Sequence, residues 1–183
     1  MRISFTAYAE DAVIGGELVL EGGRLSDFIP QDGPFEIEQV TLVALEDGRK
    51  VNVAATTVAR SDLVAITGSG PRGNAARRVR TRPHAARAQA GPYEIIGYVH
   101  AAPSVHPFGG VLRRRVLPMT SAVIRFRIAG RVVEEEHDAL LINPERIEWV
   151  EHATDEELRL GRTLALPGTV DPHAKDMTRE PAL

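Results

Sequence analysis

Alternation of apolar and polar side chains predicts that this chain is built from short β-strands separated by tight turns. Ile3, Phe5 and Ala7 alternate with polar residues in residues 2–9, which is the pattern of a strand with one buried face. Asp47-Gly48 is a strong short-range signal for a hairpin. Similar apolar patterns predict further strands over residues 12–20, 35–45, 50–58 and 63–66.

The same succession of strand and turn signals occurs again in the second half of the chain. The matched positions are Ile14 with Ile95, Gly48 with Gly130, and Val64 with Ile147. Strands are accordingly predicted over residues 93–99, 116–128, 132–142 and 146–150. We therefore expect an internal duplication, with a first domain at residues 1–67 and a second at residues 93–152. Units of roughly 65 residues are marginally stable alone, so the copies should pack on each other or on a partner.

The segment between the two copies has a different composition. Residues 68–92 contain mostly Gly, Pro, Ala and Arg, with almost no large apolar side chain, so a linker is predicted. Six arginines and no acidic residue lie between residues 72 and 87. This run is either a solvated tether or an anion-binding arm for nucleic acid, an acidic protein surface or membrane lipid. The candidate anion-binding residues are Arg77, Arg78, Arg80 and Arg82.

Residues 153–183 follow the second copy and are predicted to hold a short acidic helix and a disordered tail. Thr154 and Glu157 have the spacing of a helix capping box, and the helix should end near Gly161. Residues 165–183 carry three prolines and no apolar periodicity, which is typical of a disordered segment.

The order of the predicted elements resembles that of the small SH3-like and Sm-like barrels. We therefore expect an all-β fold, a tandem duplication of one such barrel. Residues 22–29, Gly-Gly-Arg-Leu-Ser-Asp-Phe-Ile, resemble the Arg-Leu-Ser-Asp-Phe-Leu signature of a family of small, uncharacterised bacterial β-domain proteins. The resemblance covers about residues 3–66, and residues 93–150 follow it more loosely. It implies a fold and no activity, and we expect Leu25 and Phe28 to plug one end of the first barrel.

Composition and motifs argue against several kinds of chemistry. The chain has no cysteine, which excludes disulfides, thiolate metal sites and thiol catalysis. Its six histidines lack the close pairing of structural zinc ligands, so no metal or cofactor is expected. Glu134-Glu135-Glu136 is interpreted as solvated charge rather than a paired-carboxylate site. Asn143-Pro144-Glu145 resembles the turn that grips RNA in Sm-like proteins, and the alternative is a simple Asx turn.

One loop of the second copy is the candidate interface. Residues 103–115 combine apolar and basic side chains that a small barrel has no room to bury together, and aromatic and Arg side chains are enriched at interface hot spots. The candidate interface residues are Val105, Phe108, Leu112, Arg113, Arg114 and Arg115. In the alternative interpretation, Phe108 plugs the second barrel.

These observations predict a binding, scaffold or assembly protein without catalytic residues. It should act through a protein partner or as a homo-oligomer. The alternative is a nucleic-acid-binding protein that uses the Arg-rich linker and the barrel turns, and a small-ligand or metal-dependent enzyme comes third. The N-terminus lacks an apolar signal-peptide core and no stretch approaches 18 apolar residues, so a cytoplasmic location is expected.

Overall fold

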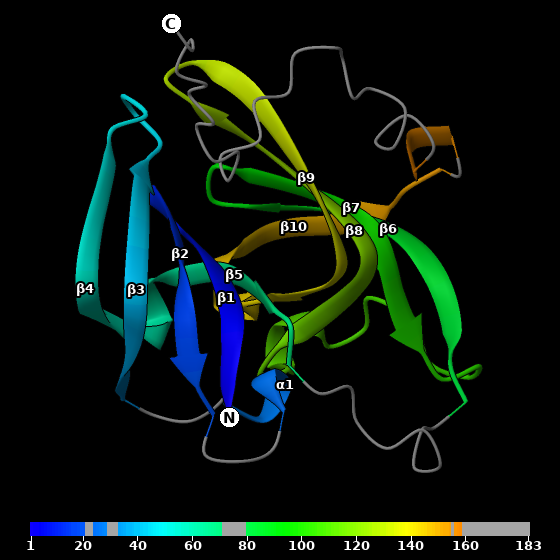
Figure 1. The fold of residues 1–183 in the computed structure, drawn as a ribbon. Coiled ribbons are helices and arrows are strands. Elements are labelled where there is room, and N and C mark those ends of the chain that lie inside the picture. Colours follow the sequence, from blue (N-terminus) through cyan, green and yellow to red (C-terminus); the bar gives the residue numbers. More distant parts are fainter. Residues whose placement is uncertain (21–23, 29–32, 71–79, 155, 159–183) are drawn as a thin grey trace, which may run out of the picture.

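A computed structural model describes residues 1–20, 24–28, 33–70, 80–154 and 156–158 of the chain (Figure 1). Within these residues, one antiparallel sheet of ten strands accounts for most of the structure, and the helices are few and short. The prediction of an all-β fold is therefore confirmed. In this part of the chain, no helix has the length and apolar character needed to cross a membrane.

The first five strands are neighbours in the order β5-β1-β2-β3-β4. They are β1 (Arg2–Ala9), β2 (Ala12–Val19), β3 (Pro34–Ala44), β4 (Lys50–Ala59) and β5 (Leu63–Gly68). A helical turn, α1 (Leu25–Phe28), follows β2, and a 3-10 turn, η1 (Arg60–Asp62), separates β4 from β5. Leu25 is buried in the core of this half. The side chain of Phe28 lies outside the described part of the structure, so its expected plug stays a prediction.

The other five strands are neighbours in the order β10-β6-β7-β8-β9. They are β6 (Arg82–Ala90), β7 (Tyr93–Ala101), β8 (Leu117–Ile128), β9 (Arg131–Ile142) and β10 (Ile147–His152). The 3-10 turn η3 (Val111–Arg113) lies between β7 and β8, and η4 (Pro144–Arg146) lies between β9 and β10. Each strand therefore has the same neighbours within its half as the corresponding strand of the first half.

Both halves bend sharply at corresponding places. Gln39 in β3 and Ser121 in β8 have positive φ angles of 50° and 46°. A Cβ atom on Gly16 of β2 would lie 2.7 Å from a backbone oxygen of β3, and one on Gly97 of β7 would lie 3.1 Å from a backbone oxygen of β8. Glycine is thus required where the neighbouring strands approach each other most closely. The register of β2 against β3 shifts at this point, between Gly15 and Glu17.

The interpretation of residues 68–92 as a linker is wrong over residues 82–90. These residues form β6, which lies between β7 and β10. Ala86, Ala88 and Ala90 are buried on one face of this strand, so the alternation of a half-buried strand is present. It is carried by alanine, whose side chain is too small to stand out from a linker rich in Ala and Arg. The strands of the second half therefore begin at residue 82.

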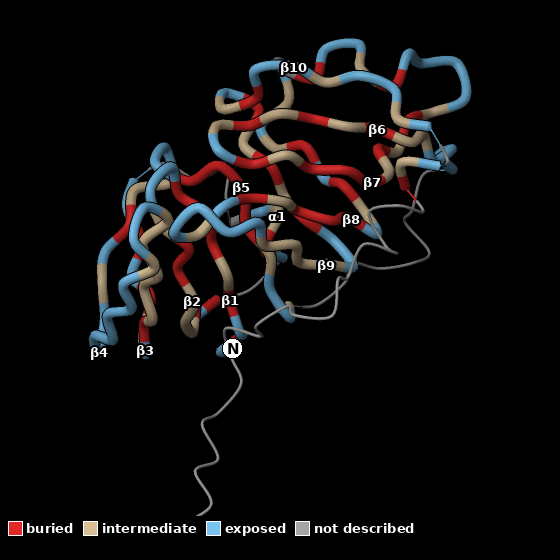
Figure 2. The backbone as a smooth tube through the Cα atoms, turned by 90° about the horizontal axis from the view of Figure 1, so that it is seen from above, coloured by how far each residue is buried: buried red, intermediate tan, exposed pale blue. Residues whose placement is uncertain are grey.

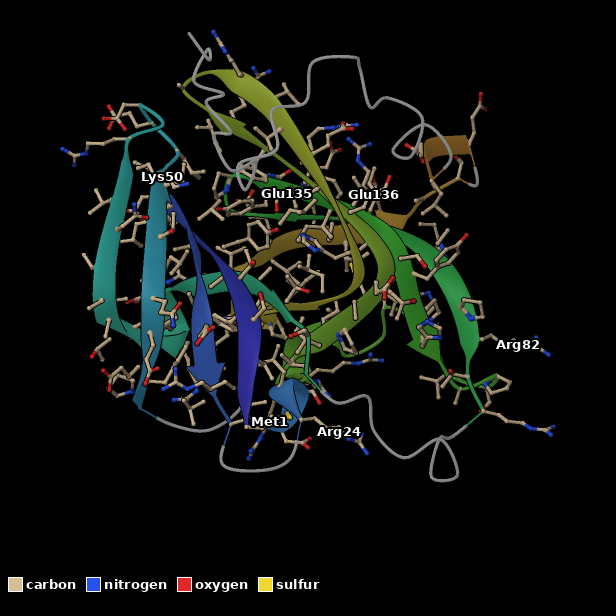
Figure 3. The ribbon with its side chains drawn as sticks, viewed as in Figure 1. Met1, Arg24, Lys50, Arg82, Glu135 and Glu136 are labelled. Atoms are coloured by element: carbon tan, nitrogen blue, oxygen red, sulfur yellow. The ribbon has the colours of Figure 1, made fainter. Side chains whose placement is uncertain are left out.

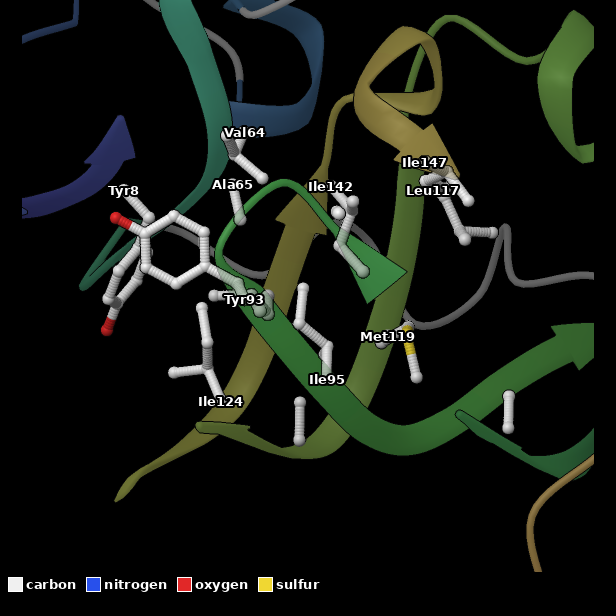
Figure 4. Close-up of a cluster of buried hydrophobic side chains, with 14 of the residues drawn as sticks. Tyr8, Val64, Ala65, Tyr93, Ile95, Leu117, Met119, Ile124, Ile142 and Ile147 are labelled. Atoms are coloured by element: carbon white, nitrogen blue, oxygen red, sulfur yellow. The ribbon is translucent and has the colours of Figure 1, made fainter. Parts of the chain in front are cut away.

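The two halves are joined by strand pairing and share part of their core. β5 pairs with β9 through Ala65 opposite Ile142 and Ile66 opposite Leu141, which makes the sheet continuous. Tyr8 of β1 packs edge to face against Tyr93 of β7, with ring centroids 5.5 Å apart, in a cluster that includes residues of both halves (Figure 4). Buried residues run through the strands of both halves, whereas β4 is largely exposed (Figure 2).

Candidate functional site at the edges of the sheet

β4 forms one end of the ten-stranded sheet, and its outer edge carries no strand among the described residues. It is ten residues long, and residues 50–55 are all exposed. Val51 and Val53 retain 40% and 37% of their accessible surface. The strand is rich in β-formers and contains no proline, and Lys50 is its one charged residue. It therefore lacks most of the devices by which proteins protect an edge strand from pairing with another chain.

β10 forms the other end of the sheet and differs from β4 in length, charge and aromatic content. It is six residues long and carries Glu148 and Glu151, both exposed. Trp149 is 39% exposed, and the Arg87 guanidinium lies 5.6 Å from the centre of its ring. This edge therefore presents one large aromatic side chain between two carboxylates.

A ladder of ion pairs crosses the second half from β6 to β9. Arg87 Nε donates to Glu94 Oε1 at 2.5 Å, Arg125 Nη1 donates to Glu94 Oε2 at 2.8 Å, and Arg125 Nε donates to Glu134 Oε1 at 2.5 Å. Burial lowers the pKa of Arg125, but hydrogen bonds and charge from Glu134 and Glu94 outweigh it and raise that pKa. The ladder extends to Glu157, 3.6 Å from Arg87. Partly exposed pairs contribute little individually, so the ladder mainly favours one register of these strands.

Glu157 also completes the capping box that the sequence predicts. The Glu157 backbone N–H donates to Thr154 Oγ1 at 3.2 Å, and the Thr154 backbone N–H donates to Glu157 Oε2 at 2.7 Å. Hydrogen bonds from the Thr154 backbone N–H and the Thr154 hydroxyl to the Glu157 carboxylate lower the pKa of that carboxyl. The helical turn is described as far as Leu158, so the predicted end near Gly161 and the disordered tail lie outside the described residues.

The contact between β5 and β9 shows how two edges of this fold meet. Beyond the paired residues, the Asn143 backbone N–H donates to the Val64 carbonyl at 2.8 Å. Asn143 Nδ2 donates to the Leu63 carbonyl at 3.1 Å, and its Oδ1 accepts from the Glu145 backbone, as in an Asx turn. Arg146 donates to the Ser61 carbonyl through Nε at 3.0 Å. The Asn143 turn thus fastens the two halves together.

A polar cluster is buried where the halves meet. The Tyr8 hydroxyl donates to Glu135 Oε2 at 2.5 Å and lies 2.6 Å from His137 Nε2, while the Tyr93 hydroxyl donates to the Ala9 carbonyl at 2.5 Å. Burial, followed by the charge of Glu135, raises the pKa of Tyr8 well above its usual range. Burial likewise raises the pKa of Tyr93. Both hydroxyls therefore act as hydrogen-bond donors between the halves.

The interpretation of Glu134-Glu135-Glu136 as solvated charge is wrong for the first two residues. Glu134 is held by Arg125, and Glu135, which is labelled in Figure 3, accepts a hydrogen bond from the buried Tyr8 hydroxyl. The partners lie on β8 and on β1 of the other half, so no local pattern in the sequence indicates them. Among the described residues, no group of His, Asp or Glu has the arrangement of a metal site.

The candidate interface loop is split between the core and the surface. Phe108 packs against the core of the second half, and its ring centroid lies 4.5 Å from that of His152. Val105 is 48% exposed, and Arg113 and Arg115 are exposed. Arg114 is half-buried and Leu112 belongs to η3, but its side chain is not described. Phe108 therefore packs on the core, while the plug interpretation and the interface role of this loop both stay predictions.

Half of the candidate anion-binding arginines lie in the described structure. Arg80 precedes β6 and Arg82 begins it, and both are exposed. Figure 3 shows the side chain of Arg82 extending away from the sheet. Arg77 and Arg78 lie outside the described residues. Arg87, at the end of the same run, is engaged in the ion-pair ladder.

An open hollow of about 680 Å³ lies at the junction of the two halves, lined by Glu10, Asp11, Glu46, Glu94, Arg125 and Arg127 among others. It exposes both charge signs, and Glu94 and Arg125 within it are already paired with each other. Its chemistry therefore does not point to one ligand class. Comparisons with protein-family models, with curated proteins and with solved structures found no match to this chain.

Proposed function

We propose that this chain is a non-enzymatic assembly module that acts through protein–protein contacts at the edges of its sheet. The observation that carries the proposal is β4, a long, exposed and nearly uncharged edge strand. An exposed strand edge binds an added strand through backbone hydrogen bonds, and side chains next to it provide specificity. Val51 and Val53 are such side chains.

The same proposal includes the origin of the fold. We take the two halves to be tandem copies of one small unit similar to SH3-like or Sm-like barrels. Support comes from the recurrence of strand neighbours and bends between residues 2–68 and 82–152. In a tandem arrangement, β9 is the counterpart of β4, and β9 is paired with β5. Pairing through this edge is therefore already used once within the chain.

The test uses charge on the β4 edge. In Val51→Lys/Val53→Lys, two lysines on β4 should repel an added strand. Val132→Lys is the matched control, because Val132 is 52% exposed on β9. Light scattering over a range of concentrations, and affinity capture with the chain as bait, measure association. We expect the wild type and the control to associate and the double variant to lose association with an unchanged melting temperature. Equal association of all three proteins would contradict the proposal.

Nucleic-acid binding is the alternative function, and the exposed Arg80 and Arg82 are its described residues. An oligonucleotide bound through arginines loses affinity steeply as salt rises. Fluorescence anisotropy at low and high salt, with Arg80→Ser/Arg82→Ser beside the wild type, tests it. Tight binding that the serine variant loses, together with a monomeric wild type, would favour this alternative.

A further inference from the structure

We infer that the two free edges of the sheet bind each other in different molecules, β10 of one chain pairing with β4 of the next. This inference rests on the proposed function and names its partner as a second copy of this chain. The argument starts from the internal pairing of β5 with β9. If β10 corresponds to β5 and β4 corresponds to β9, the two outer strands of the sheet present the same two kinds of edge that pair with each other at its centre.

Register identifies which residues of β10 correspond to those of β5. Against β1, Ala65 of β5 lies opposite Tyr8, directly before a shift in register. Against β6, Trp149 of β10 lies opposite Gln89, directly before a shift at the same place. Ala65 and Trp149 are therefore equivalent, and Ile66 is equivalent to Val150. This register makes Leu63, and not Val64 as the sequence match has it, the counterpart of Ile147.

The same reasoning relates β4 to β9. At the start of β3, Phe35 lies opposite Val58 of β4. At the start of β8, Leu117 lies opposite Ile142 of β9. Each pair lies at the same distance from the residue with positive φ that bends the longer strand. Val58 is therefore equivalent to Ile142, and the preceding Thr57 is equivalent to Leu141.

These equivalences predict the register between chains. Ala65 opposite Ile142 becomes Trp149 opposite Val58 of the next chain, and Ile66 opposite Leu141 becomes Val150 opposite Thr57 of the next chain. The two surfaces differ, so the contact has no twofold axis. Repetition of such a contact gives a ring if the rotation closes and a filament if it does not.

Chemistry at the two edges agrees with this pairing and sets its strength. β10 carries Glu148 and Glu151 without Lys or Arg, while β4 carries Lys50 without an acid. The internal contact has additional hydrogen bonds from Asn143 and Arg146, which correspond to Ala59 and Asp62 in the first half. Neither of these residues reproduces those side-chain bonds. The contact between chains therefore depends on backbone pairing and apolar packing, and should be reversible on dilution.

Cysteine cross-linking tests the register, because the chain has no cysteine of its own. Thr57→Cys/Val150→Cys places thiols on residues that should face each other between chains. Asn52→Cys/Val150→Cys is the matched control, because residue 52 lies about 17 Å further along β4, and a disulfide requires Cα atoms within about 7 Å. On oxidation we expect most of the first variant to migrate as covalent dimers or larger species, and the control to stay monomeric. Thr56→Cys/Glu151→Cys tests the same register with the exposed Glu151 in place of the half-buried Val150, if Val150→Cys lowers the melting temperature.

Mixing single variants identifies the polarity of the contact. Thr57→Cys mixed with Val150→Cys should give one cross-linked dimer, whereas neither variant alone should cross-link. Cross-linking of Thr57→Cys with itself would overturn the head-to-tail inference in favour of a symmetric β4 dimer, and would leave the proposed function intact. A monomeric wild type with no cross-linking in either register would overturn the inference. The proposed function has its own test, and it would be contradicted if Val51→Lys/Val53→Lys associated as strongly as the wild type.

Discussion

At the scale of single residues, the Tyr8 hydroxyl is the polar group on which the junction of the halves depends most. It is fully buried and contacts two titratable side chains of the other half, Glu135 and His137. A buried acceptor that loses its donor keeps the desolvation cost of burial. The effect of removing this hydroxyl should therefore exceed that of an ordinary hydrogen bond at the surface.

Tyr8→Phe should reduce the free energy of unfolding by about 1–3 kcal/mol, because it removes the hydrogen bond that the buried Tyr8 hydroxyl donates to the partly buried Glu135. Urea unfolding measures the loss. Tyr98→Phe, at a half-buried residue of β7, is the control and should change stability by less than about 0.5 kcal/mol. Equal losses for the two variants would show that the hydroxyl of Tyr8 has no special role.

The raised pKa values of Tyr8 and Tyr93 predict a fall in stability at high pH. The unfolded chain releases tyrosine protons near pH 10, whereas the folded chain retains them, so these groups stabilise the fold below that pH. The stabilisation is lost as the pH rises above about 10. Urea unfolding between pH 8 and 11 should show this decline, with a shallower slope for Tyr8→Phe than for Tyr98→Phe. A slope unchanged in Tyr8→Phe would contradict the prediction.

At the scale of elements, β6 shows what apolar patterning misses. Strands with Val, Ile and Phe on their buried face, such as β1 and β8, are predicted at nearly their observed positions. β6 buries alanines against neighbouring strands. Its alternation of buried and exposed residues does not stand out, because both faces of the strand carry alanine and the residues before it are also rich in Ala and Arg. The short-range Asp47-Gly48 signal and the capping box at Thr154 are correct because their partners lie within a few residues.

Ala86→Leu tests the structural role of β6. Ala86 is fully buried in the core of the second half, so a larger side chain should cost about 1–3 kcal/mol through overpacking. Ala54→Leu, at an exposed residue of β4, is the control and should leave the free energy of unfolding almost unchanged. Urea titration at low protein concentration measures both variants. A neutral Ala86→Leu would mean that residues 82–90 behave as the linker that composition suggested.

At the scale of the whole molecule, the two halves should unfold together. Tyr8, Val64 and Ala65 of the first half belong to the same buried cluster as Tyr93 and Ile142 of the second. The sequence indicates a repeat but not this shared core, because the contacts between the halves, such as that of Thr67 with the Ala139 carbonyl, join residues far apart in the chain. The candidate sites show the same limit. The apolar and basic side chains of residues 103–115 indicate an interface from the sequence alone, whereas the position of β4 at the end of the sheet follows only from the order of the strands.

Unfolding should accordingly be a single transition. Trp149 is the sole tryptophan and reports on the second half, while far-UV circular dichroism reports on both halves. The two probes should give coincident urea midpoints at concentrations where the protein is monomeric. A fluorescence midpoint separated from that of circular dichroism would indicate that the halves unfold independently.

The pairing of β5 with β9 also has a consequence for synthesis on the ribosome. Domains fold from the N-terminus as the chain emerges, so residues 1–68 are complete long before β9 is translated. During that interval β5 has no β9 to pair with, and in the proposed tandem arrangement β4 of another nascent chain presents the edge that corresponds to β9. Neighbouring ribosomes on one message hold such nascent halves close together, and β5 of one can capture β4 of another. A ribosome that stalls between codons 68 and 131 should therefore promote intermolecular strand pairing of nascent chains. Rapid translation of β9 shortens the period in which this misassembly can occur.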